Sequence, residues 1–448
     1  MYFSPTKKAA LSGGLLLAMV FYFLVITPPL AALYGTYNSQ RIVELTSLTL
    51  LCLLYPPRQF PAGPMGIAFT GFIMTGLVST ALSTNPGWAA IEYLRFALLF
   101  SLAFSIANAG ERKLLGYTYA LATIALAMLI KISIGIYVVH HLGGGIAAVA
   151  DGFSNHRHFA EFFVALQTLF ALLLLGSQRR LIRYAALAPL AVSTIIILMG
   201  SGRASATALA VGALVYIYLN STRRLYAAIM AISGVTLGWA VYYFLLTMPE
   251  SFLARPQDSG RFSLWAIGFK SWLDNPVFGI GPMQFASIPN DIAAHPHNSA
   301  IQFLCEWGLA GLLLVASFFA SWLSLTFRPD TYGSHRIAIS ATAAVTGLLV
   351  SSMFGGVFVV PAVELLFFVL LGISMTSDSI KWSRSRFAAM GTRVFAISIC
   401  VLSLLSWGWQ TSDTPRGAPV DAPRFWQDGR LPIYKMNFKT YPAIPSAL

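Results

Sequence analysis

Long apolar runs separated by short polar connections make up most of this chain. A helix that crosses a bilayer needs about 20 mainly apolar residues. Runs near this length predict membrane helices at 11–33, 42–55, 65–83, 88–108, 114–139, 159–176, 183–200, 203–220, 225–247, 299–325, 337–354, 359–376 and 391–409. The run at 42–55 is short enough for a half-span or an interfacial helix, so the pattern predicts twelve or thirteen transmembrane helices.

The composition agrees with an all-α polytopic membrane protein. Of the 448 residues, 57% are hydrophobic and only 10% are charged, which excludes an ordinary soluble protein. We expect four parts: N-terminal transmembrane helices at 1–247, a large loop at 248–298, C-terminal transmembrane helices at 299–409 and an extramembrane tail at 410–448. The first run is too long and too close to further spans for a cleaved signal peptide.

The basic residues predict which side of the membrane each connection faces. If the N-terminus is cytoplasmic, the inner connections hold sixteen Lys and Arg residues, whereas the outer connections before the tail hold six: Arg41, Arg157, Arg203, Arg255, Arg261 and Lys270. Cytoplasmic loops are the ones enriched in Lys and Arg. The 248–298 loop is therefore expected outside. The net charge of +13 then reflects topology and affinity for membrane lipids, with no case for nucleic-acid binding.

The large loop contains a segment with helical periodicity. Its aromatic residues recur at Phe262, Trp265, Phe269 and Trp272. This spacing predicts an amphipathic helix in the membrane interface, which Asn275-Pro276 would end. We expect the tryptophans of this region, Trp307 included, to act as interface anchors.

A titratable imidazole stands where this loop meets the next apolar run. His297 is one of only seven histidines, and it precedes the run at 299–325. The simplest role for an isolated histidine at a helix start is capping or interfacial packing. That role is weakened here because three arginines, Arg157, Arg203 and Arg261, are predicted on the same face.

The outer arginines have few carboxylates to pair with, because the chain has only sixteen acidic residues. Guanidinium groups that converge on one outer cavity would bind an external anion. A pyrophosphate suits the planar guanidinium fork, which can hold two oxygens at once. For each arginine alone, the alternative is snorkelling to lipid headgroups.

The residues around His297 resemble the histidine signature of the bacterial O-antigen ligases. His297 is followed by Asn298 and, after nine intervening residues, by Gly308-Leu309-Ala310-Gly311. Arg203 and Arg261 resemble the functional arginines of that family, although neither has the leucine four positions later that some members carry. The resemblance also includes a large periplasmic loop before the histidine.

The resemblance implies a glycosyltransferase of lipopolysaccharide biosynthesis at the periplasmic face of a Gram-negative inner membrane. The donor would be an O-antigen glycan on undecaprenyl pyrophosphate, and the acceptor a sugar hydroxyl of lipid A–core. His297 would remove the acceptor proton as general base. Arg203 and Arg261, with Arg157 as a third candidate, would stabilise the departing pyrophosphate. Direct attack by the acceptor predicts inversion at the anomeric carbon. Candidate supporting residues are Asn298, Glu306, His295 and Lys131.

The acidic residues give no sign of a metal site or of another cofactor. No two of them are adjacent or one residue apart, so the chain lacks the Asp-x-Asp pattern with which many glycosyltransferases hold a divalent metal. The pairs His140/His141 and His156/His158 are not accompanied by acidic or cysteine partners in a metal-binding pattern. A reaction that needs neither metal nor ATP is therefore expected.

Several functions remain open from the sequence. O-antigen polymerases and protein O-oligosaccharyltransferases share much of the same pattern, and fold likeness does not choose among them. A polysaccharide transporter is the alternative outside the enzymes. It would be expected to show paired broken spans and charges at mid-membrane, and the chain shows no such internal symmetry.

Overall fold

The computed structural model describes residues 5–109, 111–143, 149–150, 152–153, 155–200, 202–220, 223–246, 260–288, 290, 292–327, 336–377, 379–384 and 386–409. The predicted tail at 410–448 and the first part of the 248–298 loop lie outside these described residues.

The described chain is almost entirely helical. In its first half the helices are α1 (Pro5–Phe21), η1 (Tyr22–Ile26), α2 (Ala31–Tyr34), α3 (Thr36–Leu54), α4 (Gly63–Leu82), α5 (Pro86–Ala107), α6 (Glu111–Leu142), α7 (His156–Leu175), α8 (Arg180–Tyr184), α9 (Leu187–Gly200) and α10 (Arg203–Leu219). They continue with α11 (Arg224–Ala240), η4 (Val241–Leu245), α12 (Arg261–Asp274), η6 (Gln284–Ser287), α13 (Ser299–Thr326), α14 (Arg336–Ser351), α15 (Pro361–Ser374) and α16 (Arg386–Trp409). Two short strands, β1 (Gln59–Pro61) and β2 (Trp382–Arg384), pair antiparallel.

The helices confirm the prediction of an all-α polytopic membrane protein. Each of the thirteen apolar runs falls on helical structure. By length and composition, seven helical segments can cross a membrane: Gly63–Leu82, Pro86–Ala107, Lys113–Leu142, His156–Leu175, Arg180–Gly200, Arg224–Phe244 and Ser299–Thr326. Five shorter apolar helices accompany them, and α3, which contains the run at 42–55, belongs to neither group.

Helix α3 begins six residues before the apolar run that predicted it. Its first turns are polar, yet Asn38, Gln40, Arg41 and Glu44 are buried inside the protein. Arg41 forms ion pairs with Glu44 and Glu364. Arg41 is therefore not in an outer connection, as predicted, but inside the bundle, where buried carboxylates on α3 and α15 neutralise it.

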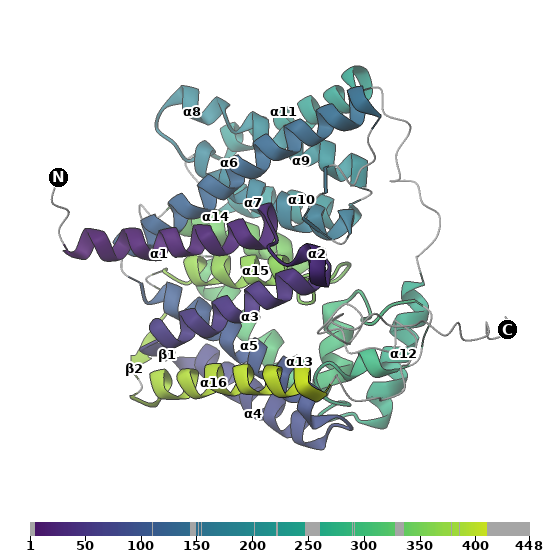
Figure 1. The fold of residues 1–448 in the computed structure, drawn as a ribbon. Helices are drawn as coiled ribbons and strands as arrows, with labels where there is room; N and C mark the ends of the chain where they lie inside the picture. The colour runs from purple at the N-terminus through teal and green to yellow at the C-terminus, as the bar shows by residue number, and fades with distance from the viewer. Residues whose placement is uncertain are drawn as a thin grey trace, which may run out of the picture.

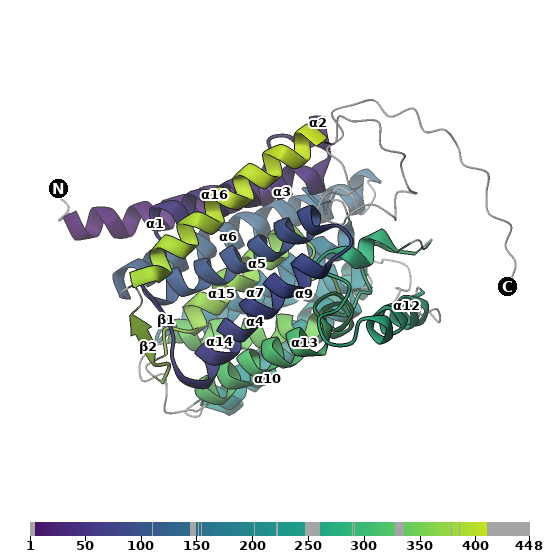
Figure 2. The same ribbon diagram turned by 90° about the horizontal axis from the view of Figure 1, so that it is seen from below.

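The helices form one bundle with the loop elements at one end. The long helices run side by side, with β1 and β2 at one end of the bundle and α12 at the other (Figures 1 and 2). Helix α5 is central and packs against α3, α4, α15 and α16, whereas α7 packs against α9, α10 and α14. This arrangement places the starts of α7, α10, α12 and α13 near one another.

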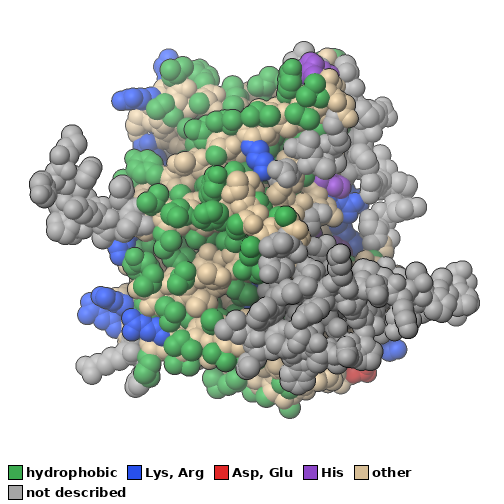
Figure 3. Space-filling view, viewed as in Figure 1, with side chains coloured by type: hydrophobic (Ala, Val, Ile, Leu, Met, Phe, Trp, Pro, Cys, Tyr) green, Lys and Arg blue, Asp and Glu red, His purple; other side chains and the backbone are tan. Residues whose placement is uncertain are grey.

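Apolar side chains cover much of the outside of the bundle, as lipid contact requires. Leu181, Leu225 and Ile67 are 82%, 75% and 73% exposed, and hydrophobic side chains dominate the face in Figure 3. Such a surface is far more apolar than that of a water-soluble monomer.

Inside the bundle, Trp307 is fully buried and stacks on Phe72 with ring centroids 4.6 Å apart. The prediction of Trp307 as an interface anchor is therefore wrong.

Candidate active site

A cationic pocket lies where several helices begin, at the end of the bundle that carries α12. Its lining residues are Asn155, Arg157, His158, Glu161, Gly202, Arg203, Ala204, Ser205, Arg261, His297, Phe354, Gly355 and Gly356. The pocket thus brings together His297 and the three arginines that the sequence singled out. Its volume of about 80 Å³ is below the 300–1,000 Å³ typical of pockets for whole small ligands, so it encloses only part of a larger substrate.

Helix N-termini add to the positive potential of the pocket. Arg157 lies in the first turn of α7, Arg203 is the first residue of α10, and Arg261 is the first residue of α12. The free N–H groups and the dipole of a helix both favour an anion at its N-terminus. Three helix starts and three guanidinium groups therefore give the pocket a positive potential.

The backbone at His297 is held in an unusual conformation. Its φ is 51°, in the left-handed region that residues other than glycine seldom adopt. The His297 N–H donates to Nδ1 of His295 at 3.2 Å, and the two rings lie 4.0 Å apart. Trp265 of α12 donates its indole N–H to the Pro296 carbonyl at 3.0 Å. Helix α12 thus carries Arg261 and also fixes the backbone next to His297.

A kink in α13 explains the Gly-x-x-Gly element after His297. Gly308 has φ 70° and ψ −177°, which interrupts the helix. The following N–H groups of Leu309 and Ala310 donate instead to the carbonyls of Pro276 and Val277. A Cβ at Gly308 would lie 2.2 Å from the Val277 carbonyl oxygen. Gly308 therefore lets the loop behind α12 dock against α13, although it lies outside the pocket.

The four candidate supporting residues do not line this pocket. The Asn298 side chain caps α13 by accepting from the Ile301 N–H at 3.1 Å, and Glu306 accepts from the Phe285 N–H at 3.1 Å. His295 shapes the loop through its bond to His297. Lys131 lies on α6, outside the set of pocket-lining residues. These residues therefore act on the structure around the pocket or lie away from it.

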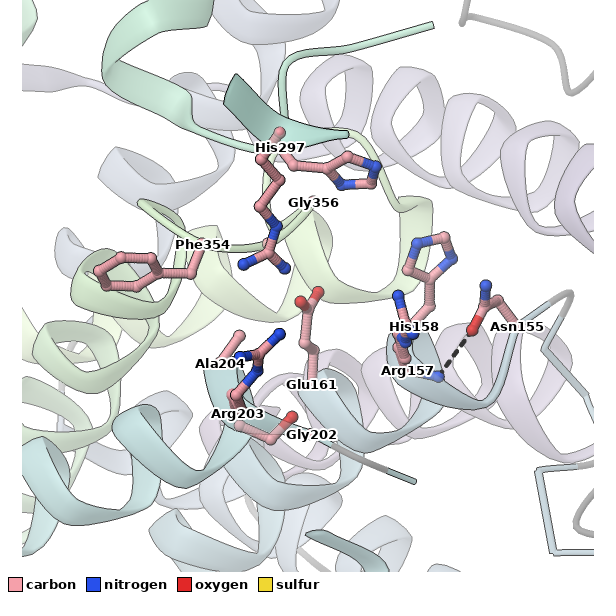
Figure 4. Close-up of a pocket in the computed structure, with 13 residues that line it drawn as sticks. Asn155, Arg157, His158, Glu161, Gly202, Arg203, Ala204, His297, Phe354 and Gly356 are labelled. Carbon is pink, nitrogen blue, oxygen red and sulfur yellow. Dashed lines mark hydrogen bonds between the residues drawn. The ribbon is translucent and has the colours of Figure 1, made fainter. Parts of the chain in front are cut away.

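Two further residues of α7 belong to the pocket: Glu161, which sequence reasoning missed, and His158, which it considered only as part of a histidine pair. The Glu161 carboxyl rises into the pocket between Arg203 and Arg157, with His158 and His297 nearby in the view of Figure 4. Oε2 of Glu161 and Nδ1 of His158 are buried with no hydrogen-bond partner. The spacing could have indicated Glu161, because a residue four positions after Arg157 lies on the same helix face.

A buried ion network supports the opposite wall of the pocket. Glu364 of α15 pairs with both Arg41 and Arg95, and Arg95 also pairs at 2.8 Å with Glu92, three positions before it on α5. Arg41 donates to the Val359 carbonyl at 2.8 Å. The network therefore anchors the connection between α14 and α15, of which Phe354, Gly355 and Gly356 face the pocket.

His297 stays neutral in this surrounding. Burial and then the positive charge of Arg261, with smaller effects of His158 and Arg157, lower its pKa from 6.5 to about 4. Both causes disfavour the imidazolium form. His297 is therefore able to accept a proton at any pH well above 4.

This pKa predicts how a reaction based on His297 depends on pH. A general base works in its neutral form, so kcat/KM should stay level on the acid side and decline only as the pH falls through about 4. Arg261→Gln removes a positive charge that lowers the pKa, so the decline should move to higher pH. Initial rates between pH 3.5 and 8, with enzyme stability checked at each pH, measure both profiles. An unchanged midpoint in Arg261→Gln would contradict the assigned electrostatics.

Among the described residues, no three His, Cys, Asp or Glu side chains are grouped so that they could hold a metal ion. His156 and His158 both lie at the start of α7, but only His158 lines the pocket.

The fold and the pocket together define a multi-pass membrane protein with a cationic pocket at the end of the bundle where α7, α10 and α12 begin. A comparison with protein families matches residues 163–316 to the O-antigen ligase family. Over this segment the chain is similar to that family, which supports a membrane enzyme of the O-antigen ligase and polymerase superfamily. The match covers about a third of the chain and includes Arg203, Arg261 and His297. No curated protein matches the chain.

Proposed function

We propose that this protein transfers an O-antigen glycan from undecaprenyl pyrophosphate to a sugar hydroxyl of lipid A–core. The reaction would take place at the periplasmic face of a Gram-negative inner membrane, as a step of lipopolysaccharide biosynthesis. The observation that carries the proposal is one pocket that joins a neutral imidazole, His297, to Arg157, Arg203 and Arg261. The family match supports the class of reaction.

The reaction needs one proton acceptor and one site for developing negative charge. The acceptor oxygen forms a bond to the anomeric carbon while the bond from that carbon to the pyrophosphate oxygen breaks. The acceptor proton passes to His297, and the arginines together with the helix N-termini stabilise the pyrophosphate that leaves. Because the donor already carries a good leaving group, no ATP is required. A single displacement inverts the anomeric configuration.

Bound donor changes the electrostatics of the base. A proton acceptor is most effective when its pKa is near the working pH, and the pKa of His297 in the empty pocket is about 4. The negative charges of a bound pyrophosphate would offset the positive charges of the nearby arginines and so raise the pKa of His297. The base would then become stronger only when the donor is in place.

Glu161 has a separate role in this scheme. Its carboxyl accepts a hydrogen bond from the Gly356 backbone and faces the same cations as the donor would. We assign Glu161 as a positioning residue, whose carboxyl group orders the arginine side chains before the pyrophosphate arrives.

The position of α12 suits a lipid-linked donor. Phe262 and Phe269 on this amphipathic helix are 67% and 43% exposed, while Leu264 and Gly268 face the protein. Exposed aromatic side chains beside Arg261 are typical of a helix at the level of the membrane interface. The polyprenyl chain can then stay in lipid while its pyrophosphate reaches the pocket.

Reconstitution with three acceptors tests the proposed function. The purified protein, a polyprenyl-pyrophosphate glycan and one of three acceptors are combined: lipid A–core, a second lipid-linked repeat, or a pilin-like protein. Product on lipid A–core alone supports the ligase. Product only on the lipid-linked repeat indicates a polymerase, and product only on the protein indicates a protein O-oligosaccharyltransferase. Movement of intact glycolipid without a new glycosidic bond would indicate a polysaccharide transporter and overturn the proposal.

The same assay tests the expected independence of metal. The arginines and helix N-termini supply the positive charge that a divalent cation gives other enzymes. Rates in excess chelator should therefore match those without it. Complete loss that Mg²⁺ or Mn²⁺ restores would contradict this expectation.

A further inference from the structure

A second cavity lies at the opposite end of the bundle from the cationic pocket that contains His297. It measures about 760 Å³, and residues of α3, α5, α6, α16, β2 and the connection around Arg58 line it. Figure 3 shows Lys and Arg side chains gathered at the end where Figure 1 places β1, β2 and the start of α16. We call this space, lined by Arg58, Lys113, Arg384 and Arg393 among others, the basic cavity.

The charged lining of the basic cavity has one sign only. Its described lining contains four cationic side chains and no Asp or Glu. These cations come from four separate parts of the chain. Lys113 lies over the Tyr55 ring, 5.8 Å from its centroid, and the Arg393 Nε–H donates to the Leu53 carbonyl at 3.3 Å. Such a group of cations attracts a phosphate.

Part of the remaining lining is apolar and adjoins the lipid-facing surface. Leu51, Leu102 and Ile106 belong to the lining, with Leu102 and Ile106 buried on α5. Beside the cavity, Leu54 of α3 and Met390 of α16 are 62% and 58% exposed, and Leu115 of α6 is 44% exposed. The cavity thus joins a cationic rim to hydrocarbon-facing helices.

We propose that the basic cavity binds one anionic glycerophospholipid from the membrane leaflet on that side. The phosphate lies among Arg58, Arg384 and Arg393, and the acyl chains follow the apolar surface of α3, α6 and α16. Basic pockets between transmembrane helices bind anionic lipid headgroups in this way. A volume of about 760 Å³ also lies within the range of ligand pockets. Lys and Arg residues that served only to orient the protein in the membrane would not need to surround one cavity whose lining includes buried apolar side chains.

Native mass spectrometry of the full chain in a neutral detergent tests the proposal. Phosphatidylglycerol is titrated against phosphatidylethanolamine, which carries no net charge. The wild type should bind one phosphatidylglycerol at least tenfold more tightly than phosphatidylethanolamine. The triple variant Arg58→Gln, Arg384→Gln, Arg393→Gln should lose this preference, because each cation near the lipid surface contributes roughly fivefold in affinity.

Two matched variants separate a bound lipid from nonspecific charge. Arg179→Gln with Arg180→Gln removes two exposed cations outside the cavity and should leave the preference unchanged. Replacing Arg58, Arg384 and Arg393 by lysine keeps the charge and should retain binding within about threefold, which also controls for misfolding of the glutamine variant.

Three outcomes would overturn the proposal. The first is equal binding of both lipids, and the second is full binding by the glutamine triple variant. The third is complete displacement of the lipid by millimolar glycerol 3-phosphate, which would identify a soluble phosphate as the ligand instead.

Discussion

His297→Gln should lower the rate of glycan transfer by about 10²- to 10⁴-fold, because general-base catalysis typically contributes that much. Glutamine keeps a polar side chain of similar size but cannot accept the proton as imidazole does. The KM for the donor should change little, since the arginines still bind the pyrophosphate. Single-turnover transfer to lipid A–core, followed by mass or gel shift, gives the rate.

His141→Gln is the matched control for this variant. His141 lies at the end of α6, is exposed and is outside the pocket. It should keep wild-type activity. Equal thermal unfolding temperatures of the two variants would show that the loss of transfer activity comes from the missing base and not from lower stability. A His297→Gln protein that folds and transfers glycan at the wild-type rate would exclude His297 as the base.

Arg203→Gln and Arg261→Gln should each lower kcat/KM by about 10²- to 10³-fold, the effect of removing one group that stabilises developing negative charge. Lysine at either position keeps the charge but not the two-pronged hydrogen bonding of guanidinium. The lysine variants should therefore recover only part of the activity. Steady-state kinetics with varied donor concentration measure these losses.

Lys270→Gln controls for a general loss of positive charge on the same helix. Lys270 is exposed on α12 and does not line the pocket. It should stay within about twofold of the wild type, as surface substitutions usually do. If Lys270→Gln lost as much as Arg261→Gln, the arginine would act through the overall charge of α12 and not through a pyrophosphate contact.

Much of the fold could be predicted because membrane helices leave a strong one-dimensional signal. Hydrocarbon requires about 20 apolar residues for each span, so the runs located the helices without knowledge of packing. The prediction was weakest at 42–55. There, polar residues continue the helix towards its N-terminus because protein, and not lipid, surrounds them. A count of apolar residues cannot detect that difference.

The site was predicted in part. His297 stood out because charged and titratable residues are rare in this chain, and the arginines stood out against the predicted charge bias. Glu161 and His158 did not, because each is one polar residue at the start of an apolar run. Arg41 was misplaced because its partner Glu364 lies 323 positions away in sequence. Such pairs become visible only when α3 and α15 are packed together.

The sequence by itself determined the membrane helices, the amphipathic helix of the loop, and the titratable and cationic residues near the ends of that helix. These depend on composition and spacing over short stretches of chain. Only the tertiary structure decided that the starts of α7, α10 and α12 meet beside His297, that Glu161 joins them, and that Trp307 is a core residue. The physical reason is that convergence of helix ends depends on how the helices pack, and that packing is set by contacts between residues far apart in the chain.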